Sequence, residues 1–114
     1  MTKVPQNSNI QITFDDIQYN IQPSTVDLTA MDDIIVSIAK GSSSATPMTV
    51  IKYSVSSAKF TIDNTLKSVT VSLTAAEATE TTGKYYANLW LVANGEYVTH
   101  LRKVFEVESV VNYE

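Results

Sequence analysis

The residue types that most often carry out catalysis are rare in this sequence, and their spacing does not suit it. His100 is the only histidine and there is no cysteine, so the zinc sites and nucleophiles that need these residues are excluded. A serine triad would need His100 beside an activated serine, yet no Gly-x-Ser-x-Gly turn occurs. The three glycines lie far apart, which excludes a glycine-rich phosphate-binding loop. We therefore expect His100 to be a surface or interface residue.

Carboxylates offer the remaining route to acid–base chemistry. Adjacent aspartates occur at 15–16 and 32–33, but neighbours on a strand point to opposite faces and do not share a site. Loop oxygens alone can bind calcium, so a site that combines Asp63 and Asn64 with another loop stays open. On balance we expect no enzymatic activity, no cofactor and no catalytic residues.

Composition limits the partners and the domain organisation. The chain has 114 residues, enough for one domain with a hydrophobic core, and a net charge of −4. Its eight Lys and Arg residues are scattered, so no nucleic-acid partner is expected. Residues 1–9 hold one lysine and no apolar run, which predicts a flexible N-terminal segment and no signal peptide. No stretch reaches the length of a membrane span, and residues 10–114 are expected to form a single domain.

Apolar and polar residues alternate with a period of two along much of the chain. The alternating runs are residues 10–14, 17–22, 34–38, 51–55 and 68–73. Such alternation is typical of half-buried antiparallel strands, and short strands separated by turn residues favour a sandwich or barrel. Residues 74–79 depart from the pattern, because Thr74 and Glu77 have capping-box spacing and predict one helical turn.

The apolar positions that share the inward face of these runs form the expected core. They are Ile12, Phe14, Ile17, Tyr19, Val36, Ile38, Phe60, Val69, Val71, Leu73, Tyr85, Leu89, Leu91, Phe105 and Val107. The last five belong to an aromatic-rich C-terminal hairpin.

The register of that hairpin can be chosen from its charges. Asn94-Gly95 is a strong signal for a two-residue turn, which would place Leu89 opposite His100 on the core face. Burying unpaired charge is costly, and a three-residue loop with a bulge shifts the register by one. Leu89 and Leu101 then share the core face, and His100 moves to the other face. We predict the three-residue loop, with a second bulge near Lys103 because that residue would otherwise face inward.

The other face of the hairpin carries a wide patch of aromatic and aliphatic side chains. The candidate interface residues on it are Tyr86, Trp90, Val92, Val98 and His100. A segment of the same chain could cover this patch. Trp and Tyr with a few polar groups are also typical anchors of protein–protein interfaces. A sugar-stacking platform is a third reading, for which Asn88 is the one obvious polar partner.

Residues 81–87, Thr-Thr-Gly-Lys-Tyr-Tyr-Ala, resemble the corner that leads into the sixth strand of immunoglobulin domains, where the pattern is Asp-x-Gly-x-Tyr-x-Cys. Gly83 and Tyr85 match this pattern, whereas Thr81 replaces the aspartate and Ala87 replaces the cysteine. With the alternation, the corner leads us to expect an all-β, immunoglobulin-like antiparallel β-sandwich with one short helical turn and no disulfide.

A longer resemblance covers residues 26–108. The Val-Asp-Leu-Thr stretch at 26–29, Leu73-Thr74 before Gly83-Lys84-Tyr85, and the Phe-x-Val ending at 105–107 resemble the N-terminal domain of phage baseplate upper proteins and related tail modules. The resemblance implies a non-catalytic structural or attachment component of a phage tail or baseplate. Such a component is made in the host cytoplasm, resides in the virion, and contacts other virion proteins and possibly itself. The alternative, based on the aromatic face, is a module that binds cell-surface carbohydrate.

Overall fold

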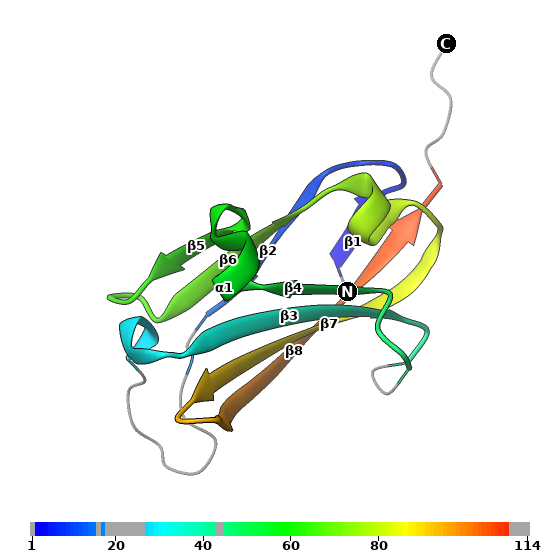
Figure 1. Ribbon diagram of the computed structural model, residues 1–114. Coiled ribbons are helices and arrows are strands. Elements are labelled where there is room, and N and C mark those ends of the chain that lie inside the picture. Colours follow the sequence, from blue (N-terminus) through cyan, green and yellow to red (C-terminus); the bar gives the residue numbers. More distant parts are fainter. Residues whose placement is uncertain (1, 16, 18–26, 43–44, 110–114) are drawn as a thin grey trace.

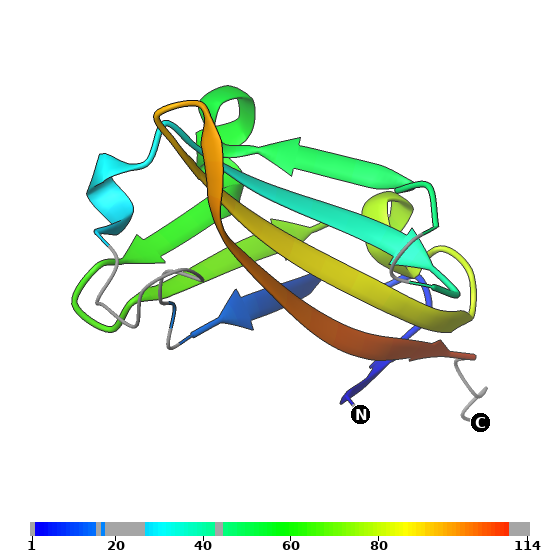
Figure 2. The same cartoon turned by 90° about the horizontal axis from the view of Figure 1, so that it is seen from below.

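The computed structural model describes residues 2–15, 17, 27–42 and 45–109, whose strands form two sheets packed face to face (Figure 1). Figure 2 shows the two sheets as separate layers. The five-stranded sheet, in spatial order, consists of β1 (Thr2–Pro5), β8 (Glu96–Glu108), β7 (Gly83–Ala93), β3 (Asp33–Lys40) and β4 (Thr49–Lys52). The three-stranded sheet consists of β2 (Ile10–Phe14), β6 (Ser68–Leu73) and β5 (Phe60–Asp63).

The strand order is that of an immunoglobulin-like sandwich. Strands β2, β6 and β5 occupy the positions of B, E and D, while β3, β7 and β8 occupy those of C, F and G. β4 extends the five-stranded sheet beside β3, and β1 extends the same sheet on its other side, beside β8. All pairings are antiparallel except that of β1 with β8, which is parallel. The predicted fold class is confirmed.

One hydrophobic core lies between the sheets and receives side chains from both. The predicted core residues that the structure describes are all buried, namely Ile12, Phe14, Ile17, Val36, Ile38, Phe60, Val69, Val71, Leu73, Tyr85, Leu89, Leu91, Phe105 and Val107. Tyr19, also predicted, lies outside the described residues. Leu28, Ile34, Ile51, Ala78 and Ala87 also belong to the core, beyond the prediction.

The predicted immunoglobulin-type corner precedes β7. Tyr85 is fully buried and stacks on Phe105 with ring centroids 5.3 Å apart. Its hydroxyl donates to the carbonyl oxygen of Thr81 at 2.6 Å, the hydrogen bond of a tyrosine corner. Gly83 has a φ of +140°, a backbone conformation that residues with a side chain rarely adopt, so the corner requires glycine at this position.

The predicted helical turn is present as η3 (Ala75–Thr79), a π-helical turn that crosses one end of the sandwich. The Glu77 carboxylate accepts a hydrogen bond of 2.8 Å from the Thr74 backbone amide, as a capping box requires. Glu77 also pairs with Lys59 at 2.6 Å. Three further short turns were not predicted: η1 (Leu28–Ala30), α1 (Tyr53–Ser56) and η2 (Ser57–Lys59).

The run at 51–55 was predicted to be one strand, and this was wrong in its second half. β4 ends at Lys52, and the chain then enters α1. Asp33 causes the change, because its carboxylate accepts hydrogen bonds from both the backbone amide and the hydroxyl of Ser54, at 3.0 and 2.9 Å. Val55, which continued strand pairing would hold within the sheet, is 81% exposed.

The hairpin between β7 and β8 reaches the predicted pairing by a different route. Asn94 and Gly95 have φ values of +54° and +75° and form a two-residue turn, with Ala93 opposite Glu96. The predicted three-residue loop is therefore wrong. The register shifts farther along, at a bulge between Leu91 and Val92, and Leu89 then pairs with Leu101 as predicted.

The predicted second bulge near Lys103 is absent, since the β7–β8 register from Leu91 to Gly83 is continuous.

Residues 1–9 were expected to be a flexible segment. In the structure β1 pairs with the end of β8, and the following turn is held by a hydrogen bond of 2.8 Å from the Asn7 amide to the Thr79 carbonyl oxygen. Residues 18–22 of the predicted run at 17–22 lie outside the described residues.

Candidate functional site

The outward side of the five-stranded sheet, here called the outer face, carries most of the candidate interface residues. Strand β7 turns alternate residues toward it, and the register places their neighbours on β3, β4 and β8. The outer face is formed by Asp33, Ile35, Ser37, Ala39, Val50, Lys52, Lys84, Tyr86, Asn88, Trp90, Val92, Tyr97, His100, Arg102, Val104 and Glu106. Tyr86, Trp90, Val92 and His100 are thus brought together as the sequence predicted.

Val98, the fifth candidate, does not belong to the outer face. Val92 pairs with Tyr97 and Leu91 pairs with Thr99, so Val98 is the extra residue of the bulge. A bulge reorients the side chains beside it. Val98 is half-buried and packs against the hydrophobic core, and Tyr97 takes the outward position opposite Val92.

A stacked pair of rings lies at the centre of the outer face. The rings of Trp90 and His100 are nearly parallel, at 15°, with centroids 4.0 Å apart. His100 Nε2 lies 3.0 Å from Oδ1 of Asn88, which is buried. A carbonyl oxygen can only accept, so Nε2 carries the hydrogen and donates it. This hydrogen bond fixes the imidazole plane, and the imidazole in turn fixes one face of the indole.

The environment of His100 keeps the imidazole neutral. Burial lowers the pKa of His100 below its usual value, and the positive charge of Arg102 lowers this pKa further. A neutral ring stacks on the indole without carrying a charge into the patch. The geometry therefore serves contact with another surface better than proton transfer, because no titratable side chain among the described residues is hydrogen-bonded to His100.

Basic side chains surround the next aromatic residue along β7. Lys84 Nζ lies 5.4 Å from the centre of the Tyr86 ring, and Arg102 Cζ lies 5.8 Å from it. Both distances suit cation–π attraction. The register also places Glu106 opposite Lys84. Tyr86 thus contacts two basic side chains, and an acidic residue lies beside one of them.

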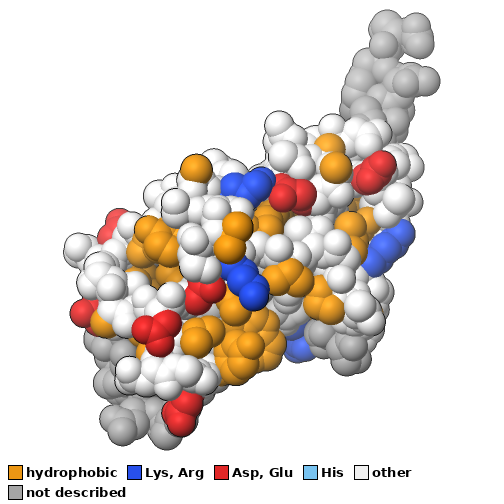
Figure 3. All heavy atoms as spheres, viewed as in Figure 1, with side chains coloured by type: hydrophobic (Ala, Val, Ile, Leu, Met, Phe, Trp, Pro, Cys, Tyr) orange, Lys and Arg blue, Asp and Glu red, His pale blue; other side chains and the backbone are white. Residues whose placement is uncertain are grey.

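Several large apolar side chains of this surface remain in contact with solvent. Tyr97, whose ring meets that of Trp90 at a centroid distance of 5.4 Å, is 65% exposed. Val50 and Met48, on or next to β4, are 53% and 46% exposed. Figure 3 shows hydrophobic side chains gathered where β3 and β7 lie in Figure 1, beside basic ones. A contiguous exposed apolar patch of this kind marks a site of interaction.

Sequence reasoning missed part of this surface. Ile35 alternates with the core residues Ile34 and Val36, so its outward position could be read from the period of two. Val50 and Lys52 belong to the outer face only because β4 pairs with β3, with Val50 opposite Ser37. No local pattern in the sequence predicts the pairing of β4 with β3.

Two of the carboxylates considered for chemistry, Asp33 and Asp63, have structural roles. Burial raises the pKa of Asp33, but the hydrogen bonds from Ser54 and the Ile34 amide, together with the charge of Lys52, outweigh burial and leave this pKa lowered. Asp63 accepts hydrogen bonds from the Thr65 and Leu66 amides at 3.0 Å each, as in a turn. Asn64 accepts from the Leu28 amide at 2.8 Å and joins η1 to that turn.

Metal and membrane features were also considered for the part of the chain that the structure describes. No group of three or more His, Asp or Glu side chains there could hold a metal ion, and Asp16 lies outside it. Within the same residues, no helix is long and apolar enough to cross a membrane.

Comparison with known proteins finds similarity to solved structures and not to sequences. No protein-family model matches the chain, and no curated protein matches its sequence. A chain from a solved structure described as "Structural basis of T cell specificity and activation by the bacterial superantigen toxic shock syndrome toxin-1" is similar, with 13% identity and a TM-score of 0.47. The alignment covers 96% of this chain and 92% of that chain. At this level the similarity identifies no partner or activity.

Proposed function

We propose that this protein is a non-catalytic structural or attachment component of a phage tail or baseplate, which binds another virion protein through the outer face. The assignment to a virion rests on the resemblance of residues 26–108 to the N-terminal domain of baseplate upper proteins. The mode of action, contact between proteins, rests on the outer face itself.

The observation that carries the proposal is the immobilised aromatic centre of the outer face. Trp90 is stacked on His100 at 4.0 Å, and His100 is tied to the buried Asn88. An anchor that is held in place before binding loses little side-chain entropy on binding. Exposed Tyr97 and Val50 extend the apolar surface around it. Rigid aromatic anchors within an apolar patch are the features of interface hot spots.

The charges around this centre indicate the chemistry of the partner. The outer face carries charges of both signs, the basic Lys52, Lys84 and Arg102 and the acidic Asp33 and Glu106. These charges lie around the apolar centre, as polar rims lie around the core of an interface. A protein with an apolar centre and charges that complement this rim suits the outer face.

The aromatic geometry favours a protein partner over a sugar. A stacking platform for sugar rings presents an open, flat ring face, and the imidazole of His100 already covers one face of Trp90. Tyr97 meets Trp90 at 64° and does not extend it as a coplanar platform. Carbohydrate binding therefore stays the less favoured alternative.

Co-expression tests the proposal. The protein would be produced together with the products of the genes on either side of its own, since tail and baseplate genes cluster, and co-purification would be measured. A stable complex with a virion protein, together with no binding on a glycan array, is the expected result. Binding to a defined glycan class without any complex would replace the proposal by the carbohydrate-binding alternative.

A further inference from the structure

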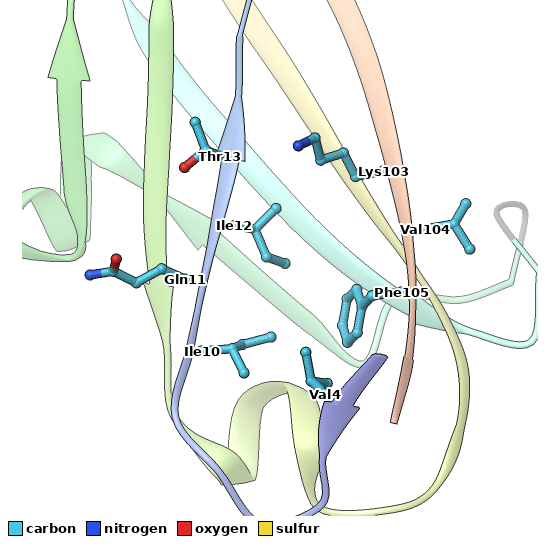
Figure 4. A pocket seen from close by; sticks show the side chains of 8 residues that line it. All are labelled: Val4, Ile10, Gln11, Ile12, Thr13, Lys103, Val104 and Phe105. Atoms are coloured by element: carbon cyan, nitrogen blue, oxygen red, sulfur yellow. The ribbon is translucent and has the colours of Figure 1, made fainter. Parts of the chain in front are cut away.

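Between β2 and β8 the two sheets enclose a cavity of about 100 Å³, lined mainly by apolar side chains (Figure 4). Ile10 and Ile12 of β2 point toward Phe105 of β8, and Val4 of β1 lies at one end. Pockets that bind small molecules usually measure about 300 Å³ or more. We therefore interpret this cavity as a gap in the packing of the two sheets and assign no ligand to it.

The turn between β7 and β8 combines features that favour a chemical change of the protein itself. Asn94 and Gly95 form this turn, and both residues are exposed. Among the described residues no hydrogen bond holds the Asn94 side chain, so its amide group can rotate toward the backbone. A Cβ placed on Gly95 would meet no atom within 4 Å, so the peptide nitrogen that follows Asn94 is not crowded. An unhindered backbone nitrogen therefore lies next to a side-chain carbonyl carbon that it can attack.

The Gly95 nitrogen already donates its hydrogen to a carboxylate. The acceptor is Oδ2 of Asp32, 3.4 Å from the nitrogen. Asp32 lies directly before β3, and its own amide donates to the Val92 carbonyl oxygen at 2.8 Å, which holds it beside the hairpin. A carboxylate within reach of a proton can remove this proton as a general base. The hydrogen lies in the plane of the peptide, whereas the nitrogen attacks perpendicular to that plane, so the hydrogen bond does not block the attack.

We propose that Asn94 is a site of spontaneous deamidation, in which the Gly95 nitrogen displaces the side-chain amide and Asp32 accepts the proton. The Gly95 nitrogen forms a bond to Cγ of Asn94 as its hydrogen passes to the Asp32 carboxylate. The bond from Cγ to Nδ2 then breaks, and ammonia leaves with that proton. The product is a five-membered succinimide ring. Water adds to one of the two ring carbonyl carbons and opens the ring, which restores the Gly95 N–H and leaves aspartate or isoaspartate in place of Asn94.

Either product changes one end of the outer face. Both add a negative charge beside Asp32 and Glu96. Isoaspartate also adds one atom to the backbone of a turn in which Ala93 and Glu96 are paired directly. The bulge beside this turn places Tyr97 opposite Val92 on the outer face, so a longer turn disturbs the position of Tyr97. The deamidation itself does not depend on what the outer face binds.

Mass spectrometry follows the reaction in the full chain. The purified, folded protein would be incubated at a fixed neutral pH, and conversion of amide to acid would be measured in the tryptic peptide of residues 85–102. This peptide also contains Asn88, which is buried and serves as an internal control. Asn7 is a second control. It too has a positive φ, but the amide after it belongs to Ser8 and donates to the Thr79 hydroxyl.

Two variants separate the role of Asp32 from that of charge alone. Asp32→Asn removes the proton acceptor, whereas Glu96→Gln removes the same charge beside Gly95 and keeps the hydrogen bond. We expect deamidation of Asn94 to be faster than that of Asn88 and Asn7. It should slow by about tenfold or more in Asp32→Asn, since general bases contribute factors of this size and above. The rate should not change in Glu96→Gln. In urea, where the fold no longer holds Asp32 at the turn, the wild type and both variants should react equally.

An Asn94 that stays intact in the folded protein and deamidates only in urea would overturn the proposal, because the turn would then protect the side chain. The absence of conversion in both states would overturn it as well. Equal rates in the folded wild type and folded Asp32→Asn would show that Asp32 is not the proton acceptor and would also contradict the proposal. Trp90→Ala leaves every rate unchanged, which separates this result from the function of the outer face.

Discussion

The hydroxyl of Tyr85 donates a hydrogen bond of 2.6 Å to the backbone carbonyl oxygen of Thr81, four residues earlier, and so pins the corner that leads into β7. The Thr81 hydroxyl lies 2.6 Å from the same phenolic oxygen. Tyr85→Phe removes both hydrogen bonds and keeps the ring. We expect the free energy of unfolding to fall by about 1–2 kcal/mol, the usual cost of such a loss at a partly buried site. Chemical denaturation measures it.

Tyr86→Phe is the matched control for the corner, because Tyr86 is the next residue and its ring faces outward. Its unfolding free energy should change by less than about 0.5 kcal/mol. If the two variants lose equal stability, the corner hydrogen bond is not what holds this turn.

Leu89 is fully buried at the centre of β7, opposite Leu101. Leu89→Ala should destabilise the fold by about 2–5 kcal/mol, through lost burial and the cavity left behind. Leu66→Ala makes the same chemical change at a residue that is 68% exposed, and it should cost less than about 0.5 kcal/mol. Equilibrium denaturation of both variants compares them. A loss well under 1 kcal/mol at Leu89 would show that the assignment of faces is wrong.

The turn at Asn94 and Gly95 requires positive φ at both positions, +54° and +75°. Gly95→Ala places a side chain in this region and should cost about 1–2 kcal/mol of unfolding free energy. Asn94→Gly keeps the turn accessible and should be nearly neutral, which makes it the control. Thermal unfolding with a fixed buffer would report both. A neutral Gly95→Ala would mean that the turn adopts another conformation in solution.

The lowered pKa of His100 predicts a pH dependence of stability. The unfolded chain binds a proton at an ordinary histidine pKa of about 6.5, whereas the folded protein does so only at lower pH. Stability is therefore full above about pH 6.5 and falls as the pH drops toward the folded pKa. His100→Gln should remove the pH dependence between about pH 5 and 7, since the lowered carboxylate pKa values act at more acidic pH. An unchanged pH profile in this variant would contradict the burial of His100.

The inward face of each strand could be predicted from the sequence, because every second residue of a strand is buried and these residues are apolar. Val69, Val71 and Leu73 illustrate this, and so do the outward threonines and serines between them. The corner at Tyr85 was also recognisable, since its glycine and tyrosine have fixed spacing. These features are determined within a few residues of chain.

The parts that sequence could not give depend on contacts between distant residues. Tyr53 and Val55 continue the alternation of β4, but Asp33 binds Ser54 from another strand and ends the pairing. The pairing of the hairpin could be predicted from the cost of burying charge. An extra residue in the turn and an extra residue at Val98 both keep His100 off the core face, so this cost does not tell the two positions apart. Because the position of the bulge was not predicted, Val98 was wrongly assigned to the outer face, although it packs against the core. Val50 belongs to the outer face only because β4 pairs with β3.

The central claim is that the outer face binds a virion protein, and Trp90 tests it most directly. Two quantities should be measured on Trp90→Ala: the affinity for the virion protein that co-purifies with the wild type, and the free energy of unfolding. Truncation of an anchor of this kind costs about 2 kcal/mol or more of binding energy. We therefore predict an affinity at least about 30-fold weaker, with an unfolding free energy within about 1 kcal/mol of the wild type. An unchanged affinity together with a large loss of stability would show that Trp90 serves the fold, and would contradict the account.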